Sequence, residues 1–372
     1  MKVLLAGGGT AGHINPALAI ASYIKEKEPD TEFLFIGNKG GMEETLVTKA
    51  GFPIKTVVIS GFYRGFKVSD IVHNVKTVHR SFISKHKAKN IIKEFKPDIC
   101  IGTGGYVSGP VLLAATRMGI PSVIHEQNAF PGITNKMLAK DADVVMLAIE
   151  DAKKHFTQKA KFAVTGNPIR PQILKANREQ SRKELNLDER PVILSFGGSL
   201  GAKCINESMA QLIARSAKDG KYQHIHAYGQ GATDFPDMLK SLGVDINSCE
   251  NLDIRPFIDD MPRCMAACDL VVSRAGAITL SEVQAMGKPC VLIPSPYVAE
   301  NHQYHNAMSM VNKKAASIIE EKNLNGDVLS KAVDDLVLDK AMLAEYSKNA
   351  QNMAIIDANE RIYKIIKDLL KK

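Results

Sequence analysis

The stretch Asp269–Asn306, DLVVSRAGAITLSEVQAMGKPCVLIPSPYVAENHQYHN, carries the signals that decide the fold. The apolar run Leu270–Val272 predicts a buried strand, a small-residue turn follows at Arg274–Ala277, and Thr279–Met286 predicts a helix. A helix that opens directly after a strand points unpaired backbone N–H groups at one spot, and its dipole favours an anion there. With a second strand at Val291–Pro294, the stretch predicts a βαβ unit with a phosphate site. A capped helix without any ligand would have the same pattern.

Two polar features in the same stretch suit a sugar rather than a bare phosphate. Glu282 lies in the first turn of the predicted helix, and a carboxylate can accept two hydrogen bonds from a ribose diol. The polar loop Ala299–Gln303 offers amides and an imidazole, as a site for a hydroxyl-rich ligand would. These residues indicate a nucleotide-sugar site, and a solvated loop is the structural alternative.

Strands and helices alternate in the same way along the whole chain. Further strands are expected at Val3–Ala6, Glu32–Ile36, Lys55–Ile59, Asp98–Ile101, Ser122–His125, Val144–Leu147, Phe162–Thr165, Val192–Phe196, His224–Tyr228, Asp253–Phe257 and Ser317–Glu320. Expected helices include Pro16–Lys27, Ser69–Glu94 and Gly109–Met118. This alternation predicts an α/β protein with doubly wound parallel sheets, whose ligands bind beyond the carboxyl ends of the strands.

The pattern pauses at Gly166–Pro171, where two prolines flank a basic residue, and then restarts. We therefore expect two similar Rossmann-like domains, residues 1–166 and 167–356, that face a cleft. The C-terminal helix, 357–372, is a candidate to pack back on the first domain.

Composition is ordinary for a soluble globular protein, with 45% hydrophobic and 24% charged residues. The N-terminus enters a first strand at once, so no signal peptide is expected, and no apolar run approaches the length of a membrane span. The six cysteines lack paired CxxC spacing, which indicates buried thiols in a reducing compartment rather than a zinc site.

The net charge of +8 is confined to the first half of the chain. Residues 1–166 hold 22 Lys and Arg against 14 Asp and Glu, whereas residues 167–372 hold 26 of each. Much of the excess lies in Arg64–Lys96, where basic residues alternate with aliphatic ones. This segment suits an anionic membrane surface, or equally a helix on a sheet with a solvated basic face. It offers few aromatic residues for base stacking, so nucleic acid is not an expected partner.

Glycine turns follow the strands at four places, Gly7–Gly12, Gly102–Tyr106, Gly197–Gly201 and Arg274–Ala277. The first resembles a loose dinucleotide fingerprint, but Gly37-Asn38-Lys39 follows the second strand, where an NAD site would have an acidic residue. No P-loop and no DxD pair at a strand end is present, so no metal and no cofactor are expected. Amides and helix dipoles would then stabilise a leaving diphosphate.

Seven motifs in order resemble the MurG family of bacterial N-acetylglucosaminyltransferases. They are Gly8–Pro16, Gly104–Pro110, His125–Asn128, Gly166–Arg170, Gly197–Ala202, Phe257–Met261 and Ser273–Glu282. The resemblance covers nearly the whole chain. It implies a GT-B fold and inverting transfer of GlcNAc from UDP-GlcNAc to the 4-hydroxyl of undecaprenyl-diphospho-muramoylpentapeptide, which gives lipid II for peptidoglycan. It also implies a peripheral protein on the cytoplasmic face of the cell membrane, with cell-wall synthesis and division proteins as possible partners.

The resemblance also implies site residues. The donor UDP-GlcNAc would contact Thr10, Ala11, Gly12, Asn128, Arg170, Ser199, Ile258, Ala277, Ile278, Thr279, Leu280, Ser281, Glu282 and Gln303. By this resemblance the Ile258 backbone reads uracil, Glu282 holds the ribose, Ser199 meets the diphosphate and Gln303 meets the GlcNAc hydroxyls. The acceptor would contact Gly104, Gly105, Tyr106 and Ser108 in the membrane-facing N-terminal domain. Many relatives have glycine at the position of Ala11 and two glutamines at the position of His302-Gln303, so either residue of that pair is a candidate sugar contact.

An inverting transfer needs a base near the acceptor hydroxyl. His13 is the candidate, because it follows the first glycine turn and an imidazole titrates in the required range; the alternative is a residue that only positions the turn. Glu126 at a strand end is the second candidate, with a structural acceptor of backbone amides as its alternative. Other functions compatible with the pattern are a UDP-sugar epimerase, a glycosyltransferase acting on diacylglycerol, a silent nucleotide-binding scaffold of the division machinery and an NAD dehydrogenase.

Overall fold

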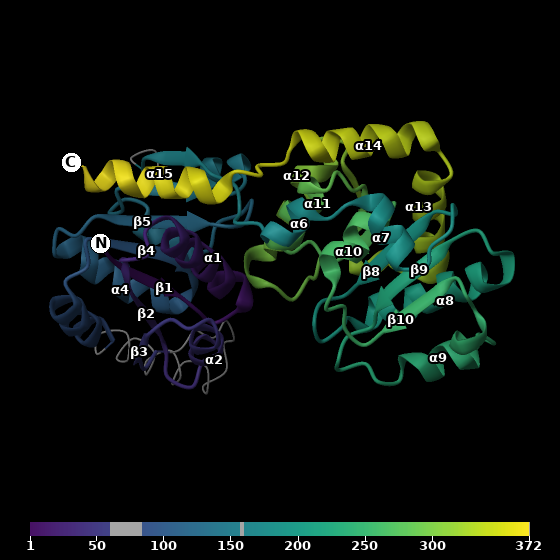
Figure 1. Cartoon of the computed structure of the whole chain (residues 1–372), viewed down its shortest axis with the longest axis horizontal. Helices are drawn as coiled ribbons and strands as arrows, with labels where there is room; N and C mark the ends of the chain where they lie inside the picture. The colour runs from purple at the N-terminus through teal and green to yellow at the C-terminus, as the bar shows by residue number, and fades with distance from the viewer. Residues whose placement is uncertain (60–83, 157–159, 372) are drawn as a thin grey trace. The chain divides into compact units, whose positions relative to one another are not determined.

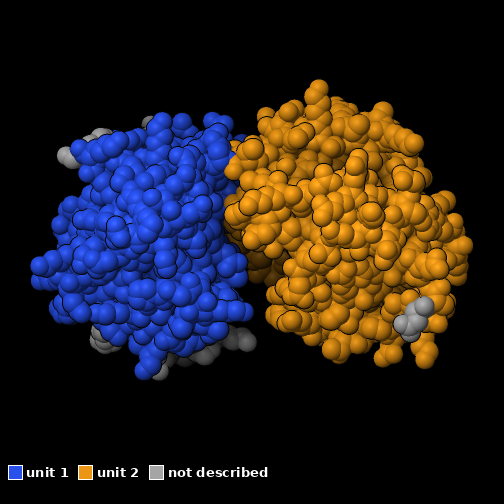
Figure 2. Space-filling model, in the orientation of Figure 1, with its two compact units in different colours: residues 1–168, 357–372 blue, residues 169–356 orange. Residues whose placement is uncertain are grey.

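The computed structural model describes residues 1–59, 84–156 and 160–371. The chain forms two compact units, coloured separately in Figure 2. Unit 1 comprises Met1–Pro168 and Asp357–Lys372, and unit 2 comprises Ile169–Ile356. The division after Pro168 lies close to the boundary that the sequence predicts after residue 166, and the C-terminal segment belongs to unit 1.

Unit 1 is built on a parallel sheet of order β3-β2-β1-β4-β5-β6-β7. Its strands are β1 Lys2–Gly7, β2 Glu32–Asn38, β3 Ile54–Val57, β4 Ile99–Gly104, β5 Ser122–Glu126, β6 Val144–Leu147 and β7 Phe162–Val164. Its helices are α1 Ala11–Lys27, α2 Met42–Lys49, residues 84–95, α4 Gly105–Arg117, α5 Ile133–Leu138, the 3-10 helix η1 Glu150–His155 and α15 Ala358–Leu370. The β1 interior is fully buried, as its apolar run predicts.

Helix α15 packs on α1 of unit 1 and completes its core (Figure 1). Ile362 and Ile366 are buried with Ile20 and Ile24 of α1. At the rim, Glu28 accepts hydrogen bonds of 2.6 Å from Tyr363 and from Lys367. The end of the chain therefore stabilises the domain in which the chain begins.

Unit 2 is built on a second parallel sheet, of order β10-β9-β8-β11-β12-β13. Its strands are β8 Val192–Phe196, β9 Gln223–Ala227, β10 Leu252–Arg255, β11 Leu270–Ser273, β12 Cys290–Leu292 and β13 Ala316–Ile318. Its helices are α6 Pro171–Lys175, α7 Arg178–Glu184, α8 Lys203–Asp219, α9 Phe235–Ser241, α10 Met261–Ala267, α11 Ala277–Ala285, α12 His302–Val311, α13 Gly326–Val337 and α14 Lys340–Asn352. The 3-10 helices are η2 Ile246–Ser248, η3 Ala299–Asn301 and η4 Glu321–Asn323.

The predicted parallel sheets are confirmed, and each expected strand overlaps an observed one. Three helices begin earlier than expected. Helix α4 begins at Gly105 and not at Gly109, and α11 begins at Ala277 and not at Thr279, which places Glu282 in its second turn rather than its first. Helix α1 begins at Ala11 and not at Pro16, which lies inside it, so Ala11 takes helical geometry and needs no left-handed conformation. The polar loop expected at Ala299–Gln303 is instead η3 followed by the first turn of α12. The helix expected at Ser69–Glu94 lies outside the described residues up to residue 83.

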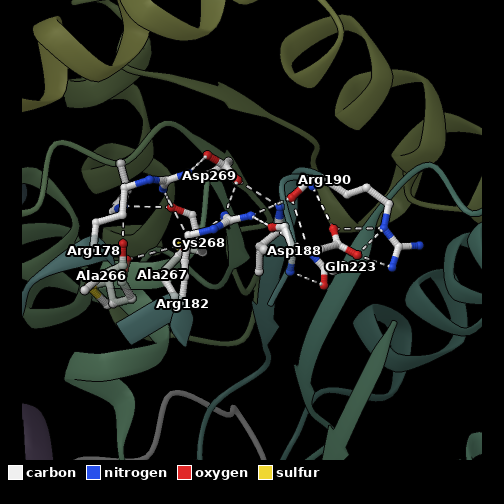
Figure 3. A network of polar contacts seen from close by, with 12 residues as sticks. Arg178, Arg182, Asp188, Arg190, Gln223, Ala266, Ala267, Cys268 and Asp269 are labelled. Carbon is white, nitrogen blue, oxygen red and sulfur yellow. Dashed lines mark hydrogen bonds and ion pairs between the residues drawn. The ribbon is translucent and has the colours of Figure 1, made fainter. Parts of the chain in front are cut away.

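A polar network holds α7 to the amino ends of two strands of unit 2 (Figure 3). Asp269, just before β11, accepts hydrogen bonds from Arg178 at 2.6 Å and Arg182 at 3.3 Å, and also from the N–H of Val192 at the start of β8. The two arginines also donate to the backbone carbonyls of Ala267 and Cys268 at the end of α10. We assign this network a structural role, because both arginines bind protein carboxylate and carbonyl groups.

Over the part of the chain that the structure describes, no helix has the length and apolar character needed to cross a membrane.

Candidate active site

Two glycine turns of unit 1 pack against each other beyond the carboxyl ends of β1 and β4. The N–H of Gly8 donates to the carbonyl of Gly104 over 3.4 Å. A Cβ on Gly105 would lie 2.1 Å from the carbonyl oxygen of Gly8, so no side chain fits there. Gly9, Gly104 and Gly105 have φ of 84°, 104° and 79°, which glycine adopts without a steric cost. The predicted turns before α1 and α4 therefore form one continuous surface of unit 1.

The predicted donor contacts Thr10, Ala11 and Gly12 lie at the start of α1. Thr10 is the N-cap residue in extended conformation, and Ala11 and Gly12 are the first two helical residues. Thr10 and Gly12 are exposed. Their amides belong to the N-terminus of α1. Unpaired N–H groups at a helix N-terminus favour an anion, so this position suits a phosphate-bearing substrate.

His13 is fixed on this surface through its Nδ1 atom. Nδ1 lies 3.1 Å from the carbonyl oxygen of Gly8 and 3.2 Å from Thr10 Oγ1. Because a carbonyl only accepts, we assign the proton to Nδ1, and the Thr10 hydroxyl is then an acceptor as well. The basic lone pair therefore belongs to Nε2, and the ring packs closely enough on Gly104 that a Cβ there would lie 2.8 Å from Cδ2. Burial lowers the pKa of His13, opposed by the hydrogen bond to Gly8 and by the charge of Glu43. A neutral imidazole with a fixed tautomer is suited to accept a proton.

The predicted acceptor residues of α4 divide into two sets. Gly104, Gly105 and Tyr106 lie at the glycine-turn surface, where a Cβ on Gly9 would touch the Tyr106 ring at 2.7 Å. Ser108 is fully buried, and a Cβ on Gly102 would lie only 2.5 Å from its Oγ. The structure thus brings three of these four residues to one surface and places the Ser108 side chain beneath it.

Glu126, at the end of β5, is a buried acceptor of four hydrogen bonds. Its Oε1 accepts from the backbone and side-chain nitrogens of Asn128, at 3.0 and 3.1 Å. Its Oε2 accepts from the N–H of Gly132 at 3.1 Å and from Asn135 at 2.8 Å. Burial raises the pKa of Glu126, and these hydrogen bonds oppose the rise. This geometry favours the structural alternative for Glu126, which holds the loop that carries Asn128.

Residues beside Glu126 link the ends of three strands in unit 1. Gln127 donates to the carbonyl of Thr103 at 2.9 Å, and His125 Nε2 lies 2.9 Å from the carbonyl of Gly166. Asn167 donates to the carbonyl of Gln127 at 3.2 Å. Burial lowers the pKa of His125 to about 4, so this histidine is neutral. The network fixes the backbone of the predicted motifs rather than presenting reactive groups.

In unit 2, Ser199 is exposed in the glycine turn between β8 and α8. A Cβ on Gly201, which has a φ of 84°, would lie 2.2 Å from the carbonyl oxygen of Tyr228, so this turn packs tightly on the neighbouring strand end. Asn206 in the first turn of α8 donates to the same Tyr228 carbonyl at 2.8 Å. Ser199 therefore stands on a rigid turn at the carboxyl edge of the sheet.

Helix α11 opens at Ala277, directly after the turn that follows β11. Of the predicted donor contacts on it, Ile278, Thr279 and Ser281 are partly exposed. Ala277 and Leu280 have buried side chains, so they can meet a ligand only through the backbone.

Arg274 ties the turn before α11 to neighbouring elements of unit 2. It pairs with Glu321 at 2.7 Å and donates to the carbonyl of Ile293 at 3.1 Å. It also contacts Cys204 Sγ in α8 at 3.4 Å. Sequence analysis placed Arg274 in a motif but did not foresee these contacts.

Arg170 and Glu282, both predicted donor contacts, bind each other. Arg170 Nε and Nη2 donate to the two oxygens of Glu282 at 2.6 and 2.8 Å. The Glu282 side chain is 5% exposed, whereas that of Arg170 is 49% exposed. A carboxylate has further lone pairs, so Glu282 can accept ribose hydroxyls while it holds Arg170.

The remaining donor candidates of unit 2 lie in the first turn of α12 and in the segment after β10. Gln303 Oε1 accepts from the N–H of Ser295 at 2.9 Å, so its NH2 group is the end that could donate to a ligand. His302 Nδ1 lies 2.8 Å from the carbonyl of Ala299, which only accepts, so Nδ1 is assigned as the donor of this hydrogen bond. Ile258, after β10, is 4% exposed, which leaves its backbone as the part able to read a base.

Glu43 of α2 is a residue that sequence analysis missed. It is 1% exposed and lies against the first glycine turn, where a Cβ on Gly8 would stand 2.1 Å from its Oε1. No local signal singles it out, since the adjacent Glu44 has the same chemistry and follows the same two glycines.

Within residues 1–59, 84–156 and 160–371, no cluster of three or more His, Cys, Asp or Glu side chains could hold a metal ion. The expectation of a metal-free site stays a prediction.

Two known domain families match the chain. The glycosyltransferase family 28 N-terminal domain matches residues 3–147, and the family 28 C-terminal domain matches residues 192–368. The chain is 48% identical over 372 residues to a protein of Acetivibrio thermocellus, covering 100% of this chain and 99% of that one. That relative is named UDP-N-acetylglucosamine–N-acetylmuramyl-(pentapeptide) pyrophosphoryl-undecaprenol N-acetylglucosamine transferase.

A relative of the same name from Ruminiclostridium cellulolyticum is 42% identical over 371 residues and covers 100% of both chains. Among solved structures, that of Acinetobacter baumannii MurG is similar, with a TM-score of 0.79, 29% identity and 99% of each chain covered.

Proposed function

The chain belongs to glycosyltransferase family 28 and, within it, to the MurG transferases, and we propose that it makes lipid II. It is a hexosyltransferase with a GT-B fold. It moves GlcNAc from UDP-GlcNAc to the 4-hydroxyl of the muramoyl sugar of undecaprenyl-diphospho-muramoylpentapeptide. The observation that carries this proposal is the sequence similarity, 48% and 42% identity over the full length of the chain, to relatives named for the same transfer.

The geometry of unit 2 supports a nucleotide-sugar donor. Ser199 on its rigid turn and the start of α11 offer polar groups for a diphosphate, as amides at a helix start do. The Arg170–Glu282 pair adds an acceptor for the ribose diol and a cation for the phosphates. Because the Ser295 N–H holds Oε1 of Gln303, its NH2 group is left to donate to a sugar hydroxyl in this proposal.

The geometry of unit 1 supports proton removal from the acceptor. In the proposed step, the 4-hydroxyl oxygen attacks the anomeric carbon and its proton passes to Nε2 of His13. The bond from the anomeric carbon to the β-phosphate oxygen breaks, and UDP leaves with that electron pair. One displacement of this kind inverts the anomeric centre. We assign Glu126 a positioning role, since both of its oxygens are already bound.

No metal is part of this proposal. Charge that develops on the departing UDP meets Arg170, the Ser199 turn and the amides at the start of α11, so protein groups can supply the stabilisation.

The membrane is the proposed location of the acceptor. Ile133 and Met137, one turn apart on α5, are 55% and 66% exposed, and Lys136 and Lys140 flank them. Helix α5 packs on α4, the helix that begins at the acceptor turn. Apolar side chains among lysines suit an anionic bilayer surface. We propose peripheral binding at the cytoplasmic face; residues 64–83 of the predicted basic segment lie outside the described residues.

The test is transfer of radiolabelled GlcNAc from UDP-GlcNAc to a short-chain lipid I analogue in the presence of EDTA. Labelled lipid product is expected. Product that forms only after magnesium is added would contradict the metal-free mechanism. UDP-GlcNAc binding without any transfer to the lipid would overturn the proposed activity and favour an epimerase or a nucleotide-binding scaffold.

A further inference from the structure

A buried carboxylate lies behind the proposed base. Glu43, the second residue of α2, is 1% exposed and is surrounded by glycines of the first glycine turn, of β2 and of the turn before α2. A Cβ on Gly8 would lie 2.1 Å from its Oε1, one on Gly41 2.6 Å from its Oε2, and one on Gly37 2.6 Å from its Cγ. The Asn38 N–H donates to Oε1 at 3.2 Å. The chain thus keeps space free at three positions to admit one charged side chain.

Glu43 is coupled to His13 through Gly8. The Gly8 carbonyl accepts from His13 Nδ1 at 3.1 Å, and the same residue packs on the Glu43 carboxylate. The Glu43 charge also reaches the start of α4, where it raises the pKa of Tyr106 in the acceptor turn. A negative charge behind the protonated ring nitrogen favours the imidazolium form of His13.

We propose that Glu43 is a positioning residue for the transfer, because its carboxylate supports the first glycine turn and stabilises His13 as an imidazolium. This inference rests on the proposed function. When the acceptor hydroxyl gives its proton to Nε2, the ring becomes positive, with Nδ1–H still directed at Gly8. Glu43 then offsets a charge that forms only as the new glycosidic bond forms, so its contribution is to the transition state.

Two opposing effects act on the proton affinity of His13. Burial lowers its pKa, whereas the Gly8 hydrogen bond and the Glu43 charge raise it. Among the described residues, Glu43 is the charged group that raises the pKa of His13, and Tyr106 is a titratable group whose pKa the same carboxylate raises. Removal of the Glu43 charge should therefore make His13 a weaker base.

The experiment compares the pH dependence of kcat/KM for lipid II formation in the full chain and in Glu43→Gln. The acid limb, where His13 becomes protonated, is expected to move about 0.5 to 1 pH unit lower, as loss of a nearby opposite charge predicts. The plateau of kcat should fall about tenfold, with KM for UDP-GlcNAc changed less than about twofold. Glu44→Gln is the matched control, since the adjacent Glu44 accepts from the N–H of Gly40 at an exposed position, and its profile should match the unmodified chain.

A merely structural role predicts a lower plateau with the acid limb unmoved, and that result overturns the proposal. If Glu43→Gln does not fold, Glu43→Asp carries the test, because withdrawing the charge must move the limb in the same direction by a smaller amount; an unmoved limb contradicts us. If the unmodified chain transfers no GlcNAc, the proposed function fails. NMR titration of His13 with and without Glu43→Gln then still tests the coupling, and an equal pKa in both would overturn it.

Discussion

Arg170 and Glu282 form a bidentate ion pair, 2.6 and 2.8 Å long, between residues 112 positions apart in the sequence. The pair joins the residue before α6 to the middle of α11, which lies beside the candidate phosphate site. It converts two separately predicted donor contacts into one preorganised group. Hydrogen bonding to Glu282 raises the pKa of Arg170, so the guanidinium is permanently charged.

Replacement of Arg170 by lysine should weaken donor binding, because lysine cannot make the two parallel hydrogen bonds of a guanidinium. We expect KM for UDP-GlcNAc to rise about tenfold, which corresponds to roughly 1.4 kcal/mol. Steady-state kinetics with varied donor measure this effect. Lys175→Gln on the exposed side of α6 is the control, and an unchanged KM in Arg170→Lys would remove Arg170 from the donor site.

Substitution of His13 separates its base role from its contact with Gly8. The Asn side chain of His13→Asn can still donate near the position of Nδ1 but has no group at Nε2. If Nε2 is the base, His13→Asn and His13→Ala should both lose roughly 10²- to 10⁴-fold in kcat with little change in donor affinity. Activity in His13→Asn close to that of the unmodified chain would show that Nδ1 is what matters. Asn15→Ala, exposed on the same helix, controls for disturbance of α1.

Glu126→Gln should act through stability and not through chemistry. The glutamine NH2 group cannot accept, so hydrogen-bond donors around one oxygen lose their partner, at a cost of about 2 kcal/mol. We expect a lower midpoint of thermal unfolding, together with parallel losses in donor binding and kcat. A selective loss of kcat with unchanged thermal stability would restore Glu126 as a catalytic candidate.

The network around Asp269 should stabilise unit 2 without affecting catalysis. Asp269→Ala removes two arginine contacts and the hydrogen bond to Val192 at partly buried positions, and should cost about 2 to 3 kcal/mol of unfolding free energy. Denaturant titration measures the loss. Asp188→Ala removes the more exposed pair with Arg190 (Figure 3) and should cost less than about 1 kcal/mol. Equal losses in the two variants would contradict this ranking.

Two buried histidines of β9 should make unit 2 sensitive to acid. Burial lowers the pKa of His224 and of His226 to about 3, from an ordinary value of 6.5. As pH falls below 6.5, the unfolded chain binds protons that the folded chain does not. Stability is therefore present above about 6.5 and is lost as pH falls toward 3.

The test is the pH dependence of unfolding free energy in His224→Leu. Neither ring nitrogen of His224 has a hydrogen-bond partner among the described residues, so the variant should be at least as stable at pH 7. It should also lose less stability between pH 6.5 and 4. An unchanged slope would show that His224 does not contribute to acid sensitivity.

Most of the architecture followed from local signals. Apolar runs such as Leu270–Val272 form buried strands, because an inner strand of a parallel sheet removes its apolar side chains from water on both faces. The glycine turns lie where the chain must reverse at a strand end. Helix starts were predicted less well. The first turn of α1 contains Gly12 and His13, whose helical propensity is poor, and Pro16 suggested a later start. Packing of the two glycine turns compensates for this weak propensity.

Periodicity and ordered motifs are properties of neighbouring residues, and they were sufficient to predict the two parallel sheets, the candidate loops at their carboxyl edges and the family. Which polar groups are already engaged in hydrogen bonds is visible in the folded chain and not in the sequence. Glu126 is saturated by its own loop, Glu282 holds Arg170, His13 has a fixed tautomer, and Glu43 lies behind it. Hydrogen bonds and charge interactions depend on distances of a few ångströms between residues far apart in the chain. No pattern along the sequence specifies those distances.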